Sequence, residues 1–113
     1  MFSGEVEIVL ELDKENFENE VLKAEGTVLV DFYSDGCVPC QALAPSIHEF
    51  ENRYGDKIKF TGLNITKARK LAIAQKVLGV PVVAIYRGGS KVEELVKDDA
   101  TPANIEAMIK KYL

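Results

Sequence analysis

The sequence lacks a surplus of basic residues, a long hydrophobic run, an internal repeat and any low-complexity segment. Its 14 Lys and Arg are outnumbered by 18 Asp and Glu, which gives a formal net charge of −4 at pH 7. Because a nucleic-acid footprint needs a basic patch, we expect no nucleic-acid partner. The apolar runs are about half a dozen residues long, far below the roughly 20 of a membrane-spanning helix. The sequence therefore also predicts that no membrane is involved.

We also expect no export signal. Residues 1–10 include Glu5 and Glu7 and show no cationic stretch followed by an apolar one. The default location is then the cytoplasm, where thiols are kept reduced. With 113 residues, 47% of them hydrophobic, the chain has the size and composition of a globular domain that folds without covalent staples. We expect residues 1–113 to form a single domain.

Cysteine and histidine are scarce, and tryptophan is absent. The sequence has two cysteines, Cys37 and Cys40, and one histidine, His48. A zinc site needs four ligands, so this set of side chains is incomplete. His48 lies off the apolar stripe of its predicted helix, so we expect it to be a solvated surface residue. A disulfide across about four residues stabilises a fold by roughly 2 kcal/mol, against about 3 kcal/mol for a fifteen-residue loop, so a structural staple would be inefficient. A redox pair is the third interpretation, and C-x-x-C beside β-α-β units favours it.

The pattern of apolar residues predicts an α/β fold. Residues 27–33 form a nearly continuous β-branched and aromatic run, typical of a central strand covered on both faces. Gly88-Gly89 predicts a hairpin, and Thr101-Pro102 predicts the start of a helix. Strands are expected over residues 5–10, 27–33, 57–63, 80–86 and 91–97, and helices over 13–24, 37–54, 66–78 and from 101 onward, with Gly55 and Gly79 ending the second and third helices.

These elements follow one another in the order β-α-β-α-β-α-β-β-α. That order predicts a mixed sheet of about five strands flanked by four helices. Crossover connections imply parallel strands in the first half of the chain, and the Gly-Gly hairpin adds an antiparallel edge. Sites in such sheets form beyond the carboxyl ends of central strands, which is where residues 34–40 are expected to lie.

The place of the two cysteines in the predicted helix gives them different chemistry. Cys37 would stand at the helix N-terminus, where free N–H groups and the helix dipole favour a thiolate. Cys40, one turn further along, would be shielded and within reach of Cys37. Val38 and Pro39 are compatible with the first turn, because the missing N–H of proline is not needed there.

Several motifs together resemble the thioredoxin family. They are Val30-Asp31-Phe32-Tyr33, Cys37-Val38-Pro39-Cys40, Ala44-Pro45, Val80-Pro81 and Gly88-Gly89, and they come in family order over nearly the whole chain. The resemblance implies the thioredoxin fold. It also implies a dithiol–disulfide oxidoreductase whose redox group is the cysteine pair, with no cofactor and no metal.

For the reacting groups, the resemblance makes Cys37 the nucleophile that attacks a substrate disulfide and Cys40 the thiol that resolves the mixed disulfide. Asp31 interrupts an apolar strand, where a carboxylate is costly to bury. The resemblance makes it the buried acid that takes the proton from Cys40, and burial should raise its pKa. A partly hydrated strand end is the alternative interpretation of Asp31.

For substrate binding, the resemblance identifies Pro81 with the family's cis-proline and Val80 with the residue whose backbone binds the substrate chain. A trans proline at a strand entry is the alternative. The complete set of expected substrate-binding residues is Val80, Pro81, Gly36, Val38 and Pro39.

The sequence departs from the family pattern at four places. Val38 replaces a Gly between the cysteines, and Gly36 replaces the Trp before them. Gly62 stands where the family often has a Lys near the buried acid, so the pKa of that acid should rise further. Asp98-Asp99 stands where a Gly-Ala pair commonly helps to form an apolar docking surface. These changes leave the partners and the reduction potential open.

The expected function is that of an electron carrier. A thioredoxin reductase would reduce it, and as a monomer it would then reduce disulfides in client proteins. A thiol oxidase or disulfide isomerase remains an alternative because of Val38. A thioredoxin-fold binding module with a dispensable dithiol is another, against which the intact cysteine pair and Asp31 argue.

Overall fold

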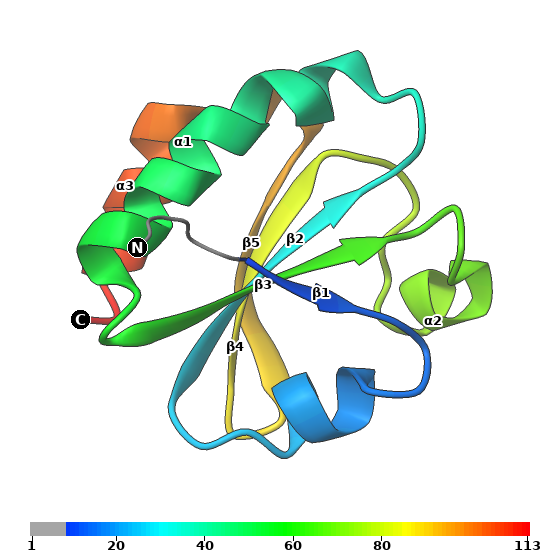
Figure 1. Cartoon of the computed structure of the whole chain (residues 1–113), viewed down its shortest axis with the longest axis horizontal. Helices are drawn as coiled ribbons and strands as arrows, with labels where there is room; N and C mark the ends of the chain where they lie inside the picture. The colour runs from blue at the N-terminus through cyan, green and yellow to red at the C-terminus, as the bar shows by residue number, and fades with distance from the viewer. Residues whose placement is uncertain (1–8) are drawn as a thin grey trace, which may run out of the picture.

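A computed structural model describes residues 9–113, so most of the strand expected over residues 5–10 lies outside the described part. Figure 1 shows a twisted sheet with helices packed around it. The elements in chain order are β1 (Leu10–Leu12), the short π-helical turn η2 (Glu18–Leu22), β2 (Thr27–Tyr33), α1 (Val38–Tyr54), β3 (Ile58–Asn64), α2 (Arg69–Ala74), β4 (Val82–Arg87), β5 (Ser90–Val96), the 3₁₀ turn η3 (Lys97–Asp99) and α3 (Pro102–Lys110).

The five strands form one mixed sheet in the order β1-β3-β2-β4-β5. The first three strands of the chain are parallel, as predicted, while β4 is antiparallel to β2 and β5 is antiparallel to β4. The antiparallel part therefore begins one strand earlier than the hairpin alone implied. The reason is that α2 lies beside the carboxyl end of β3, so the chain enters β4 from the edge of the sheet at which β2 and β3 end. Consequently, the loop before β4 lies next to the loop after β2.

Two apolar layers cover the sheet. One joins the sheet to η2 and α2 and includes Phe17 and Tyr86, whose rings meet edge to face with centroids 6.0 Å apart. The other joins it to α1 and α3 and includes Ile47 and Ile105. Figure 1 shows α1 and α3 side by side, away from α2. Fully burying a side chain of this kind stabilises the fold by roughly 1.5–3 kcal/mol, so both layers contribute to it.

The central strand was predicted to the residue, and its alternation decides where the site lies. Val28, Val30 and Phe32 belong to the η2–α2 layer. Leu29 belongs to the α1–α3 layer, and because side chains alternate along a strand, Asp31 points toward the same side as Leu29. The carboxyl is thereby directed toward the helix that carries the cysteines.

Helix ends were predicted less well than strands. The helix expected over residues 66–78 is confined to α2, and Gly79 does not close it. Lys76 ends this region instead, with a left-handed φ of 63° that brings the N–H of Val77 within 2.8 Å of the Ala72 carbonyl oxygen. Gly55 does cap α1, but in a right-handed conformation with φ of −66°.

The first expected helix, residues 13–24, has only η2 as its regular part. The Asp13 carboxylate accepts hydrogen bonds from the N–H groups of Glu15 and Asn16, so it does fix the start of this turn. Phe17 and Val21 are buried on one face, as expected.

The two glycines of the hairpin and the start of the last helix agree with the sequence. Gly88 and Gly89 have φ of 60° and 82°, the left-handed pair that a tight two-residue hairpin turn requires. Thr101 caps α3, because its hydroxyl oxygen accepts a hydrogen bond of 3.2 Å from the N–H of Asn104.

Candidate active site

Two loops meet at one edge of the sheet. Strand β2 ends at Tyr33, and residues 34–36 lead directly into α1, as predicted. Strand β4 runs the other way and begins at Val82, which pairs with Phe32. Pro81, which precedes Val82, therefore lies at the same edge as the cysteine pair.

The two cysteines are joined by a disulfide at the start of α1. Their Sγ atoms are 2.11 Å apart, and their Cα atoms are 5.3 Å apart. Cys37 is the N-cap residue of the helix, and its sulfur accepts a hydrogen bond of 3.2 Å from the N–H of Cys40. Cys37 is partly exposed, whereas only 7% of Cys40 is accessible. When the pair is reduced, the free N–H groups and the helix dipole favour a thiolate at Cys37.

The residues around the pair are open to solvent. Val38 is 71% exposed, and Pro39 is also exposed in the first helical turn. Gly36 has a left-handed φ of 74° with open space where a Cβ would lie. A residue with a side chain would be strained in that conformation, so glycine suits this position.

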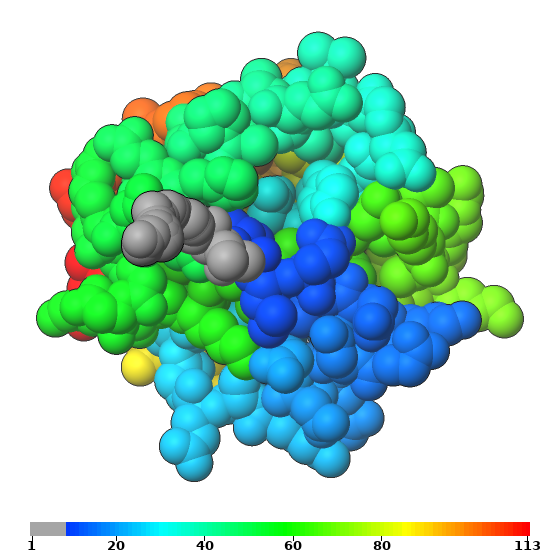
Figure 2. All heavy atoms as spheres, viewed as in Figure 1, coloured from blue at the N-terminus to red at the C-terminus, as the bar shows by residue number. Residues whose placement is uncertain are grey.

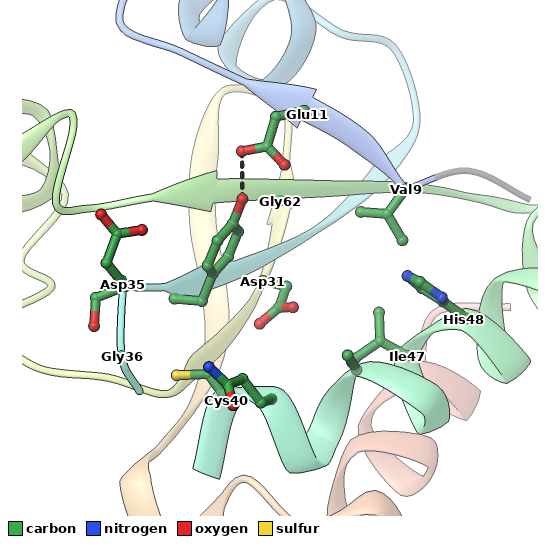
Figure 3. A pocket seen from close by; sticks show the side chains of 13 residues that line it. Val9, Glu11, Asp31, Asp35, Gly36, Cys40, Ile47, His48 and Gly62 are labelled. Atoms are coloured by element: carbon green, nitrogen blue, oxygen red, sulfur yellow. Dashed lines mark hydrogen bonds between the residues drawn. The ribbon is translucent and has the colours of Figure 1, made fainter. Parts of the chain in front are cut away.

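Asp31 and Cys40 both line a pocket of about 440 Å³ beneath α1. Figure 3 shows the Asp31 carboxyl on β2 pointing into this pocket, below the sheet neighbours Glu11 and Gly62. The pKa of Asp31 is raised to about 7, mainly by burial and to a smaller extent by the nearby Glu11 carboxylate. The direction agrees with the expectation for a buried acid. Figure 2 shows the hollow where the blue β1, the cyan end of β2 and α1 meet.

Glu11 and Tyr33 belong to this pocket, although neither was assigned a role in the site from the sequence. The Tyr33 hydroxyl donates a hydrogen bond to the Glu11 carboxylate. Burial, followed by this hydrogen bond, raises the pKa of the Tyr33 hydroxyl above its ordinary value. The alternation of acidic and apolar residues at the N-terminus was the available signal for Glu11. The register of β1 against β3, which brings Glu11 opposite Gly62, was not visible.

Gly62 lies directly opposite Asp31 in the β2–β3 register, which agrees with its expected place near the acid. A Cβ there would meet Tyr33 and Val9 side-chain atoms at 3.5 Å, which is ordinary contact. Position 62 can therefore hold a side chain, and because glycine has none, the pocket stays open beside Asp31.

The peptide bond between Val80 and Pro81 is cis, as expected. Pro81 is buried, and its carbonyl oxygen accepts a hydrogen bond of 2.7 Å from the N–H of Lys97. Lys97 has a left-handed φ of 54°, and its side chain lies over Gly79, since a Cβ there would be 2.7 Å from the lysine Cε. Lys97 thus occupies the left-handed position of this loop, where glycine would be favoured. The resemblance to the family placed its glycine one residue later, at the Asp98-Asp99 pair.

His48 is exposed, as predicted, but it also lines the rim of the Asp31 pocket, which was not predicted (Figure 3). Within residues 9–113, no cluster of three or more His, Cys, Asp or Glu side chains could hold a metal ion. In the same part of the chain, no helix is long and apolar enough to cross a membrane.

Comparison with known proteins agrees with this geometry. The family model described as thioredoxin matches residues 8–111. A thioredoxin from Acetoanaerobium sticklandii is 59% identical over 105 residues, which cover 93% of this chain and all of the relative. A thioredoxin from Peptoclostridium acidaminophilum is 54% identical over 94% of this chain and 96% of its own length. Thioredoxin-1 of Schizosaccharomyces pombe is 35% identical over 89% of this chain and 94% of its own length.

The match thus spans the sheet, the cysteine pair and the cis-proline loop. The structure confirms the predicted mixed sheet with its flanking helices, and the pair lies at the edge where a dithiol can meet a substrate. The chain belongs to the thioredoxin family and is a dithiol–disulfide oxidoreductase with disulfide reductase function.

Proposed function

We propose that Cys37 attacks, Cys40 resolves and Asp31 accepts the proton in the reduction of client disulfides. The Cys37 thiolate attacks one client sulfur and forms a mixed disulfide, and the other client sulfur leaves as a thiolate that takes a proton from water. Cys40 then passes its proton to the Asp31 carboxylate and attacks the Cys37 sulfur. The second client thiolate leaves and is protonated, so the client gains two electrons and two protons while the pair becomes a disulfide.

The observation that carries this assignment is the contrast between the two sulfurs. Cys37 is partly exposed at a helix N-terminus, whereas Cys40 is buried and shares a pocket with Asp31. A client can reach only the first sulfur, and only the second has a carboxyl of raised pKa beside it as a proton acceptor.

The client chain is proposed to lie along the exposed rim of the pair. Val80 supports this, because it precedes the cis peptide bond and lies at the same sheet edge as the pair. The exposed surfaces of Gly36, Val38 and Pro39 complete the contact area on the other side.

The proposed electron donor is a thioredoxin reductase, as membership of the family suggests. The chain is proposed to act as a monomeric domain over residues 1–113, with no resident cofactor or metal. Its proposed setting is the cytoplasm, since a dithiol that reduces clients must itself be kept reduced. Partners other than a reductase and disulfide-containing proteins are not part of the proposal.

The assignment of the two cysteines is tested with Cys37→Ser and Cys40→Ser. Cys40→Ser should accumulate a mixed disulfide with a disulfide-containing protein such as insulin, because attack proceeds and resolution cannot. Cys37→Ser should not, because its remaining thiol is buried. Masses of alkylated, non-reduced samples distinguish the two. Equal trapping by both variants would show that the roles are not divided in this way.

The direction of electron flow is tested by the reduction potential of the Cys37–Cys40 pair. Titration against defined dithiol buffers, read as alkylation by mass, gives this value without a Trp signal. A potential at the reducing end of the dithiol range is expected for a reductase. A potential at the oxidising end would favour the oxidase or isomerase instead.

A further inference from the structure

Glu11, Gly62 and Asp31 lie in one row across three neighbouring strands. Glu11 pairs with Gly62 between β1 and β3, and Gly62 pairs with Asp31 between β3 and β2. Residues paired in register point to the same face of a sheet, so both carboxyls point toward the pocket under α1. Because the residue between them is glycine, β3 contributes no side chain at this place, and the Tyr33 ring and the Val9 side chain flank it instead.

Tyr33 fixes the position of Glu11 in this row. It lies two residues after Asp31 on β2, so its side chain projects to the same face. Its hydroxyl donates to the Glu11 carboxylate, which Figure 3 shows above the Asp31 carboxyl at the pocket wall. An otherwise mobile surface carboxylate is thereby held at one place in the pocket.

The remaining charged groups around Asp31 do not offset Glu11. The titratable groups that line the pocket are Glu11, Asp31, Tyr33, Asp35, Cys40 and His48. Asp35 accepts a hydrogen bond of 2.9 Å from the Asn64 side chain, and Cys40 is in the disulfide. On the other side of Asp31 its partner on β4 is the fully buried Val83. Among the described residues, no Lys or Arg lines this pocket, so only His48 at its rim could bring a positive charge.

We propose that Glu11 is a positioning residue of the redox site, whose charge, held by Tyr33 across the gap at Gly62, increases the proton affinity of the Asp31 carboxyl. A negative charge nearby favours the neutral form of a carboxyl. Burial remains the larger cause of the raised Asp31 pKa, and Glu11 is the second. The proposal rests on the proposed role of Asp31 as the proton acceptor for Cys40, and gives that acceptor a stronger affinity for the proton it receives.

The first test is the titration of Asp31 in the oxidised protein, followed by NMR of the carboxyl carbons. Glu11→Gln removes the charge and keeps an oxygen that can accept from Tyr33. We expect the Asp31 midpoint to fall by about half a pH unit, as for a partly screened charge two strand spacings, or about 10 Å, away. Glu25→Gln is the matched control, because it removes the same charge from an exposed site at the opposite end of β2.

Tyr33→Phe is the second variant, since it keeps the charge and the ring but frees the Glu11 carboxylate. A smaller fall of the Asp31 midpoint is expected, because an untethered carboxylate moves toward water. An unchanged midpoint in Glu11→Gln would overturn the proposal. So would an equal shift in Glu25→Gln, because the effect would then come from net charge alone.

A second readout separates this proposal from the proposed function. The pH dependence of mixed-disulfide resolution should shift downward in Glu11→Gln by the same amount as the Asp31 midpoint. If the midpoint shifts and the rate profile does not, Glu11 acts on Asp31 as proposed, but Asp31 is not the acceptor for Cys40. If neither shifts, Glu11 has no such role, and the function of Asp31 is tested separately by its own substitution.

Discussion

The two sides of the cysteine pair are built on different physical principles. On the pocket side, the ionisation of Asp31 depends on the charge and size of the side chains around it, and Gly62 leaves room for a further side chain there. On the loop side, Pro81 is fixed by backbone geometry, with a cis peptide bond and a backbone hydrogen bond from Lys97. The comparison teaches that pH should act through the first side, while backbone substitutions should act through the second.

The largest expected effect is on stability, through Asp31→Asn. The folded pKa of Asp31, about 7, is raised above the unfolded value, so the folded state binds the proton more tightly. Stability from this group is therefore highest below about pH 4 and falls as the pH rises to about 7. Asn stays neutral, so the variant should be more stable at pH 8, by up to about 4 kcal/mol, and little changed at pH 4.

Denaturant unfolding of the oxidised protein at both pH values measures this difference. Asp98→Asn is a matched control, because Asp98 is exposed and its loss should have little effect at either pH. A gain of equal size at pH 4 and pH 8 would mean that the ionisation of Asp31 is not its cause.

The next effect is on rate, again through Asp31→Asn. At pH 7 we expect resolution of the mixed disulfide to slow by about a hundredfold, the low end of what a positioned base contributes. Single-turnover reduction of a client, followed by rapid acid quench, measures it. The wild-type rate should rise as the pH passes 7, and the variant should lose that rise. A loop-side substitution, Lys97→Ala, should keep the wild-type pH profile, and losing it would break the distinction between the two sides.

A smaller effect is expected from Gly62→Lys, which adds a cation beside Asp31. The site tolerates a Cβ, and an ammonium nearby should lower the Asp31 midpoint by about one pH unit. Carboxyl NMR titration gives the midpoint, and Gly62→Met supplies similar bulk without charge. If the Met variant lowers the midpoint as much as the Lys variant, the change comes from pocket filling and not from electrostatics.

The smallest effect is expected on the loop side, from Lys97→Gly. A left-handed φ of 54° costs a residue with a Cβ about 1 kcal/mol, which glycine avoids. The extra backbone entropy that glycine loses on folding offsets part of this, so the variant should gain about 0.5 kcal/mol of stability at pH 4 and at pH 8 alike. Unfolding curves test this, with Lys97→Ala as the control that removes the charge and keeps the strain. A gain that appears only at high pH would instead link this loop to the titration of Asp31.

The strands from β2 onward could be predicted because their signals are local, whereas β1 spans Leu10–Leu12 and shares only Leu10 with the strand expected over residues 5–10. The run over residues 27–33 gave β2 its exact limits, and the hairpin glycines located the turn before β5. The start of α1 followed from the cysteine pair and Pro39. The end of α2 could not be predicted, because Lys76 takes the left-handed conformation for which glycine would be expected. The packing of the buried Val77 and Ala72 outweighs the local preference for glycine there.

Part of the site could also be predicted, because its signals are local in the sequence. Cys37, Cys40, Asp31 and Pro81 lie in motifs that are visible along the chain, and the cis state of the Val80–Pro81 bond agrees with the expectation. The substrate contacts and the roles of these residues remain proposals. Glu11 could not be assigned to the pocket, because it is separated from Asp31 by 20 residues and meets it only through β3.

The sequence by itself determined the redox pair, the helix that begins at it, the central strand with its acid and the family. These depend on neighbours along the chain, which set strand alternation, helix start and thiolate preference. The tertiary structure decided which charges share a pocket with Asp31 and which residue lies against the cis-proline loop. Those contacts depend on strand register and on the path of the connections, because a shift of one residue would point Glu11 to the other face of the sheet.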